Sequence, residues 1–199
     1  MKTITLITNS DILNLEDTIK LSKKLSRIGL DRIQIREKNI PKNKLRNFIK
    51  KMKDSIDETC KLILNGNFDL AVEYKLNGVH FPEKYPITKK FSTKNLIIGR
   101  SIHENTKLTN DHNNFDYFHL GPIFTTLSHP NGKTIDEENI SYISKKLSNI
   151  VLVGGINKNN AKKLLKYNFS GIAVMRELLL STNPEETFLN LKEKINEYS

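Results

Sequence analysis

Short apolar runs rich in β-branched residues alternate along this chain with longer stretches in which apolar residues recur at helical spacing. Each of the short runs has the length of a buried strand. The runs cover residues 3–8, 32–35, 61–65, 78–81, 96–99, 117–121, 150–155 and 171–175. The helical patterns cover 15–29, 41–56, 69–75, 136–147, 157–168 and 184–198, with one more helix expected after His103 and a short one at most after Tyr85.

This alternation of strand and helix predicts the fold class. A strand followed by a helix, repeated about every 25 residues, indicates parallel βαβ units. Eight units in 199 residues predict an α/β TIM barrel, (β/α)₈, as a single compact domain over residues 1–199. An open, doubly wound sheet is the alternative. The helix starts agree with the pattern, because Pro41, Asn157 and Asn183 stand where cap or first-turn residues belong.

The stretch LILNGNFDL, residues 62–70, allows two interpretations. Asn-Gly after a strand-like run is a strong signal for a tight hairpin. However, Phe68, Ala71 and Leu76 recur at helical spacing, so a second strand is not expected to follow. We therefore expect Asn65 and Gly66 at the carboxyl end of the third strand, where barrels of this kind assemble their sites.

Composition narrows the function classes. The chain is 37% hydrophobic and 27% charged, and no apolar segment approaches the roughly 20 residues that span a membrane. No export signal is visible, and the single cysteine, Cys60, fits a reducing compartment. We expect a soluble protein of the cytoplasm that has no membrane partner.

The net charge of +10 raises nucleic-acid binding as an alternative. Most lysines are spaced around apolar residues, in KLSKKL, KNKLRNFIKKMK and NAKKLLK, as on the solvent faces of amphipathic helices. Aromatic residues are not interleaved with these lysines, as they are in many single-strand binders. The solvent-face interpretation is favoured, no nucleic-acid partner is expected, and a homo-oligomer stays open.

Polar residues follow the second strand in the sequence QIREK. Alternation places Gln34 and Arg36 on one side of this strand, with Lys38 just beyond it. Two cations and an amide at the barrel mouth predict a clamp for a polyanion. A solvated turn with local ion pairs is the alternative.

Two further segments offer ligand-binding groups. Gly154 and Gly155 lie between a strand and a helix, which leaves backbone N–H groups accessible, and barrels often hold a phosphate with the loops after strands seven and eight. The alternative for these glycines is a tight turn only. The segment 124–133 is either a ligand loop or a polar connection, and it offers Thr126, Ser128 and His129.

The remaining histidines give no metal signature. His80 and His103 end strands and are either core or rim residues, whereas His119 stands mid-strand and is expected to be structural. No pair of histidines has the spacing of a metal site, and neither a nucleophile elbow nor a Walker-type phosphate loop occurs.

Taken together, the strand ends resemble the thiamine phosphate synthase and TenI superfamily, whose TenI-type members include thiazole tautomerases. LITNS is similar to its L-I-T-D-x, QIREK to its Q-x-R-E-K, and LILNGNFDLAVEYKLNGVHF to its I-I-N-D-x-x-D-L-A...G-V-H-L. IIGRSIH resembles I-G-x-S-x-H, FDYFHLGPIFTT resembles D-Y-x-x-x-G-P-x-F-x-T, and VGGI with GIAVM resembles the final two strands. The resemblance runs over nearly the whole chain. It implies a (β/α)₈ barrel that joins, or handles one of, an aminopyrimidine diphosphate and a thiazole phosphate.

The resemblance also implies which residues contact the ligands. Those facing the pyrimidine diphosphate are Gln34, Arg36, Lys38, Asn65 and Ser101. Those holding the thiazole phosphate are Thr126, Ser128, Gly154, Gly155 and the backbone at Met175 and Arg176. Arg176 stands where a serine is usual, so it adds a cation beside the phosphate.

The chain departs from both branches of the superfamily. The synthase pattern has aspartates where Gly66 and Tyr85 stand here, and neither residue offers the carboxylate that Mg²⁺ prefers. The loop lysine that would contact the diphosphate corresponds to His129. TenI-type proteins also lack these aspartates, but the acid/base histidine of the tautomerase corresponds to Pro122. A proton shift would then need His129 or His103 as its base.

We therefore expect a thiamine-biosynthesis protein that binds a thiazole phosphate-like ligand at the barrel mouth, with TenI-type, thiazole tautomerase-like activity favoured. The alternatives are a divergent thiamine phosphate synthase and a non-catalytic ligand-binding or regulatory protein. No cofactor is expected, and Mg²⁺ only if the synthase alternative holds.

Overall fold

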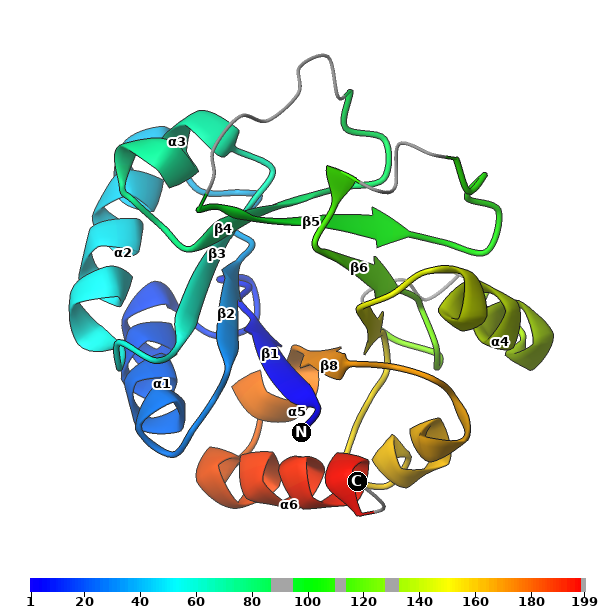
Figure 1. Cartoon of the computed structure of the whole chain (residues 1–199). Coiled ribbons are helices and arrows are strands. Elements are labelled where there is room, and N and C mark those ends of the chain that lie inside the picture. Colours follow the sequence, from blue (N-terminus) through cyan, green and yellow to red (C-terminus); the bar gives the residue numbers. More distant parts are fainter. Residues whose placement is uncertain (87–94, 110–113, 128–132, 198–199) are drawn as a thin grey trace.

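The computed structural model describes residues 1–86, 95–109, 114–127 and 133–197. Parallel strands close into a barrel in sequence order, and helices lie around its outside (Figure 1). The strands are β1 Thr3–Ile7, β2 Arg32–Ile35, β3 Lys61–Asn65, β4 Gly78–Phe81, β5 Ile97–Ile102, β6 Tyr117–Leu120, β7 Ile150–Val153 and β8 Gly171–Val174. The helices are α1 Leu15–Arg27, α2 Lys42–Ser55, α3 Phe68–Glu73, α4 Glu137–Lys146, the 3₁₀-helix η2 Ala161–Lys166, α5 Arg176–Leu179 and α6 Pro184–Asn196. The predicted (β/α)₈ barrel is confirmed, and the open-sheet alternative is wrong.

The first and last strands close the ring. In β1, Thr5 is in register with Arg32 of β2 on one side and with Ala173 of β8 on the other. Both pairings are parallel, as are the other pairings around the ring, so the strands of the described residues run the same way and their carboxyl ends lie at one end of the barrel. Closure also gives each strand two neighbours, which removes the exposed edges of an open sheet.

Most boundaries follow the sequence pattern, and the differences have local causes. Strand β5 continues past the predicted residues 96–99 because Arg100 and Ser101 stay in register with Phe118 and His119 of β6, although their side chains are polar. No helix forms in the described residues 103–109, where the chain instead turns and the Thr106 hydroxyl accepts the His103 N–H at 2.8 Å. The short α5 was not predicted.

Two apolar clusters stabilise the barrel. Successive side chains of a strand point to opposite faces, so Ile4 and Leu6 pack outward against the helices, while Thr5 and Ile7 point inward. The outer cluster includes buried residues of α6 such as Phe188. The inner cluster is small, and it consists of Ile7, Tyr117, Val151 and Ala173 with a few partly buried neighbours. Within the described residues, no helix has the length and apolar character that crossing a membrane requires.

Gly99 of β5 makes room for the inner cluster. A Cβ atom at this position would lie 2.1 Å from Tyr117 Cζ and 2.5 Å from its hydroxyl oxygen. The Tyr117 hydroxyl in turn forms a 3.1 Å hydrogen bond with His80 Nδ1. The tyrosine ring therefore occupies the space that any larger residue at position 99 would need.

We predict that Gly99→Ala lowers the free energy of unfolding by about 1–3 kcal/mol, because the ring of Tyr117 must move within a packed interior. Urea denaturation measures the change. Gly66→Ala is the matched control, since a Cβ there meets nothing within 4 Å and the only cost is its backbone φ of +77°. Equal losses in the two variants would contradict the steric explanation.

Candidate functional site

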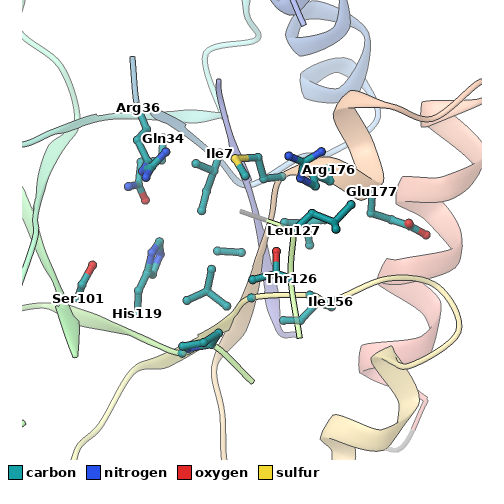
Figure 2. Close-up of a pocket in the computed structure, with 18 of the residues that line it drawn as sticks. Ile7, Gln34, Arg36, Ser101, His119, Thr126, Leu127, Ile156, Arg176 and Glu177 are labelled. Atoms are coloured by element: carbon teal, nitrogen blue, oxygen red, sulfur yellow. The ribbon is translucent and has the colours of Figure 1, made fainter. Parts of the chain in front are cut away.

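A cavity of about 510 Å³ opens at the carboxyl ends of the strands (Figure 2). This is the end of a (β/α)₈ barrel at which loops after the strands build ligand sites. Residues of all the strands except β4 line it, together with residues that follow β2, β4, β5, β6, β7 and β8. The lining residues that carry polar groups are Gln34, Arg36, Lys38, Asn65, Glu83, Ser101, His103, His119, Thr125, Thr126, Asn157, Arg176 and Glu177.

The structure brings the predicted ligand-binding residues together. Those that line the cavity are Gln34, Arg36, Lys38, Asn65, Ser101, His103, Thr126, Gly154, Gly155, Met175 and Arg176. Ser128 and His129 lie outside the described residues. The roles assigned to all of these residues stay predictions, but their common location agrees with one shared site.

The β2–α2 loop supplies two cations whose neighbouring carboxylate is engaged elsewhere. Glu37 accepts hydrogen bonds from the Thr8 hydroxyl at 2.5 Å and from the Ser10 N–H at 2.8 Å. Among the described residues, the side chains of Arg36 and Lys38 form no ion pair or hydrogen bond. The local ion pairs of the alternative interpretation are therefore absent here within the described residues.

The electrostatic state of these two cations is unfavourable without a ligand. Burial lowers the pKa of Arg36, and the charge of Glu37 offsets this only in part. The charge of Arg36 lowers the pKa of Lys38, and burial lowers it further. Two like charges held together in a partly buried position have lost hydration, and Glu37 compensates only Arg36 and only in part. An anion in the cavity would supply that counter-charge.

The β7 loop offers backbone donors of a different kind. Gly154 and Gly155 have φ values of +102° and +65°. The Gly155 carbonyl accepts a 2.9 Å hydrogen bond from Asn160 Nδ2, so the N–H of Ile156 on the same peptide plane points the opposite way. In the described part of the chain, neither the Gly155 nor the Ile156 N–H has a hydrogen-bond partner. These N–H groups suit a phosphate oxygen.

Arg176 connects this region to a second, smaller cavity. The second cavity, of about 330 Å³, shares Arg36, Lys38, Leu127, Met175 and Arg176 with the first. Figure 2 shows Arg36 and Arg176 on either side of Ile7 at the cavity rim. The three cations thus stand along the boundary between the two spaces.

The two lining carboxylates are engaged in hydrogen bonds. Glu83 accepts a hydrogen bond from the Thr106 hydroxyl. Glu177 accepts the Lys158 N–H at 2.9 Å. Within the described part of the chain, neither forms an ion pair with Arg36 or Lys38. The polar lining of the described cavity therefore favours anionic over cationic ligands.

His103 stands at the rim in a defined tautomer. Its Nδ1 lies 2.6 Å from the carbonyl oxygen of Gly121. A carbonyl oxygen only accepts, so Nδ1 carries the proton, and in the neutral ring Nε2 keeps its lone pair. An imidazole oriented in this way can take a proton from a ligand.

The cavity floor is a layer of buried polar side chains. Gln34 Nε2 donates to Asn65 Oδ1 at 3.1 Å. His80 bonds the Tyr117 hydroxyl through Nδ1 and the Ser101 hydroxyl, 2.9 Å away, through Nε2. Burial, with a contribution from the charge of Arg36, lowers the pKa of His80 to about 3, so this histidine is neutral. One of its two hydroxyl partners then donates to it while the other accepts from it.

His119 was expected to be structural, and no cavity position was predicted for it. Its buried side chain lines the cavity floor (Figure 2). Period-two alternation along β6 puts His119 on the same face as Tyr117, which belongs to the inner cluster. The pattern alone gave no sign of which face would be the inner one.

The described residues do not fit a carboxylate-bound metal ion. Gly66 has no side chain, and Tyr85 packs its ring against Phe81 with 4.5 Å between the ring centroids. No group of three or more His, Cys, Asp or Glu side chains in the described part of the chain is arranged to hold a metal. Mg²⁺ prefers oxygen ligands that include a carboxylate, and Glu83 alone does not make such a site.

Comparison with known proteins identifies relatives over most of the chain. Residues 4–178 match the family model TMP-TENI, thiamine monophosphate synthase. The thiamine-phosphate synthase of Clostridium tetani is 31% identical over 185 residues, which are 89% of this chain and 88% of that protein. The thiamine-phosphate synthase of Clostridium botulinum strain Loch Maree is 33% identical over 159 residues, 76% of this chain and 77% of that protein. The solved structure of thiamine phosphate pyrophosphorylase from Pyrococcus furiosus matches with a TM-score of 0.83 at 24% identity, over 98% of this chain and 96% of that chain. This similarity supports the fold.

The neutral histidines of the floor predict how stability depends on pH. The folded-state pKa of His80 is about 3, and burial together with the charges of His80 and Arg32 lowers that of His119 well below its ordinary value of 6.5. Below pH 6.5 the unfolded chain therefore binds more protons than the folded chain. The free energy of unfolding should fall by up to about 1.4 kcal/mol per pH unit for each histidine as the pH drops from 6.5 to 5.

Urea denaturation at several pH values measures this slope, and His119→Leu should reduce it by about half the two-histidine contribution. Stability that is constant or rises between pH 6.5 and 5 would show that these rings are already protonated in the folded protein.

Proposed function

Because this chain belongs to the thiamine monophosphate synthase family, we propose that it joins an aminopyrimidine diphosphate to a thiazole phosphate. In this reaction the ring nitrogen of the thiazole attacks the methylene carbon that carries the diphosphate. The carbon–nitrogen bond forms as the carbon–oxygen bond breaks, the thiazole nitrogen becomes positively charged, and diphosphate leaves with the electron pair. The products are thiamine phosphate and diphosphate, with no proton lost from the ring nitrogen.

One observation carries this proposal: a single cavity is lined by two different kinds of anion-binding group. Arg36 and Lys38 provide charged side chains without ion-pair partners on the β2 side. Gly155 and Ile156 provide free backbone N–H groups on the β7 side. A reaction between two phosphorylated molecules needs two such places, whereas a reaction on one phosphorylated molecule needs one.

The cations are proposed to act on the leaving group. Negative charge builds up on the diphosphate as the carbon–oxygen bond breaks, and fixed positive charges aimed at that position lower the barrier. Arg36 is held for this purpose by its backbone, since its N–H donates to the Thr8 hydroxyl at 3.1 Å. Holding the backbone in advance leaves only the Arg36 side chain to be ordered when the diphosphate binds.

Apolar residues of the cavity are proposed to bring the two rings together. Ile7, Val153, Ala173 and Met175 line the wall between the two anion-binding regions. Such a wall packs against flat heterocycles and excludes water, which would otherwise compete as the nucleophile. Magnesium, which the resemblance implies for the synthase, has no matching carboxylate set among the described residues, so no step of this proposal passes through it.

We predict that Arg36→Ala lowers kcat/KM for thiamine phosphate formation by 100-fold or more, corresponding to about 3 kcal/mol. Product is followed by NMR after mixing the purified chain with both substrates, with and without Mg²⁺. Lys44→Ala is the control, because it removes the same charge from the exposed face of α2.

The control should keep kcat/KM within about twofold of the unchanged protein. Equal effects of the two substitutions would show that Arg36 acts only through net charge. Absence of product from the unchanged protein under all conditions would remove the synthase proposal itself.

The orientation of His103 favours a second candidate function. A thiazole tautomerase-like isomerase, the activity favoured from the sequence, moves a proton on the thiazole ring and needs one base near neutrality. The Nε2 lone pair of His103 is available at the rim of the cavity, fixed by the bond from Nδ1 to Gly121. The relatives compared above are named as synthases, so this candidate rests on the histidine alone.

For this candidate we predict that His103→Ala slows interconversion of the thiazole carboxylate tautomer by 100-fold or more, since a positioned base contributes about 10²–10⁴ to such rates. NMR of the two tautomers gives the rate. The same substitution at His129 tests the other base proposed from the sequence. Full activity in both variants would exclude both histidines as the base.

A further inference from the structure

Two polar atoms on the cavity floor have no hydrogen-bond partner. Gln34 Oε1 in β2 and His119 Nε2 in β6 are both buried, and within the described residues neither is hydrogen-bonded. Both residues line the cavity, and Figure 2 shows their side chains pointing toward one another. Such atoms lose hydration without compensation unless something else binds them. The floor is therefore incomplete without a ligand group between these two side chains.

The neighbouring side chains do not complete this floor. Gln34 uses its Nε2 on Asn65, which leaves its oxygen unpaired. His80 packs against His119 with 4.3 Å between the ring centroids, but both nitrogens of His80 are engaged by Tyr117 and Ser101. These neighbours therefore leave both open atoms unsatisfied.

The two open atoms define which ligand groups are complementary. A glutamine oxygen can only accept a hydrogen bond. Burial and the nearby charges of His80 and Arg32 lower the pKa of His119, so its ring is neutral and Nε2 offers either one lone pair or one N–H. A ligand must therefore present at least one N–H to Gln34, with a second N–H or a ring nitrogen toward His119.

We propose that His119 is a specificity-determining residue that, together with Gln34, recognises the amino-substituted edge of the pyrimidine ring. This inference rests on the proposed function, because that function supplies a ring anchored by its diphosphate at Arg36 and Lys38. An oxo group in place of the amino group would set an oxygen against Gln34 Oε1. Sites built to hydrogen-bond one substituent discriminate far more strongly against its replacement than apolar pockets do.

The test compares the aminopyrimidine diphosphate with the same molecule in which an oxo group replaces the amino group. Isothermal titration of the full chain should give at least about 100-fold tighter binding of the amino compound. In His119→Leu this preference should fall below about tenfold, because the open nitrogen is gone while the volume is nearly kept. His119→Gln, which restores a polar group, should recover part of the preference, and affinity for inorganic diphosphate should stay within twofold in both variants.

Val153→Ala is the matched control, since it changes an apolar lining residue and should weaken both pyrimidines without changing their ratio. Circular dichroism at the titration temperature checks that each variant is folded. If His119→Leu is unfolded, His119→Gln is used to test the proposal instead. The proposal is overturned if the unchanged protein binds the two compounds equally or binds neither. It is also overturned if both His119 variants keep the preference of the unchanged protein. Discrimination without thiamine phosphate formation would instead count against the proposed function alone.

Discussion

The pairing of β1 with β8 is the interaction on which the site depends, because it turns a row of parallel strands into a ring. In an open sheet the residues after β2 and those after β7 would lie several strands apart. In the closed barrel Arg36 and Gly155 line one cavity. The ring also fixes the inward face of each strand, so a one-residue slip in register would turn Gln34 and His119 away from the floor.

At the mouth of this ring, two positively charged side chains lie close together, which is electrostatically unfavourable. Burial lowers the pKa of Arg36, and the charge of Arg36 lowers the pKa of Lys38. The carboxylate beside them in the chain, Glu37, accepts a hydrogen bond from Thr8 in the β1–α1 loop. A local ion pair would have been more stable in the empty protein. The arrangement becomes favourable when an anion binds, which is how a folded protein can exchange some stability for affinity.

The sequence predicted the strands and the polar mouth well, because both depend on short-range patterns. Strands β2, β3 and β4 match the expected residues since their apolar runs are bounded by polar or glycine residues. It failed for β5 beyond Gly99, where pairing with β6 holds polar residues in a strand. It did not place His119 at the cavity, because a histidine within an apolar strand is equally compatible with the core and with a cavity. Only the three-dimensional ring shows that the inward face of β6 ends in open space.

The two proposals place affinity and specificity in different layers of the same barrel. The rim carries charge on loops, where Lys38 and Arg176 border both cavities and are close to water. The floor carries neutral groups on strands, where burial keeps His80 and His119 uncharged. A charged floor would attract any anion regardless of its ring, whereas a neutral floor with fixed hydrogen-bonding atoms distinguishes rings of equal charge. Because the two layers act through different forces, substitutions in the loops can change how tightly phosphates bind while the strands preserve which ring is accepted.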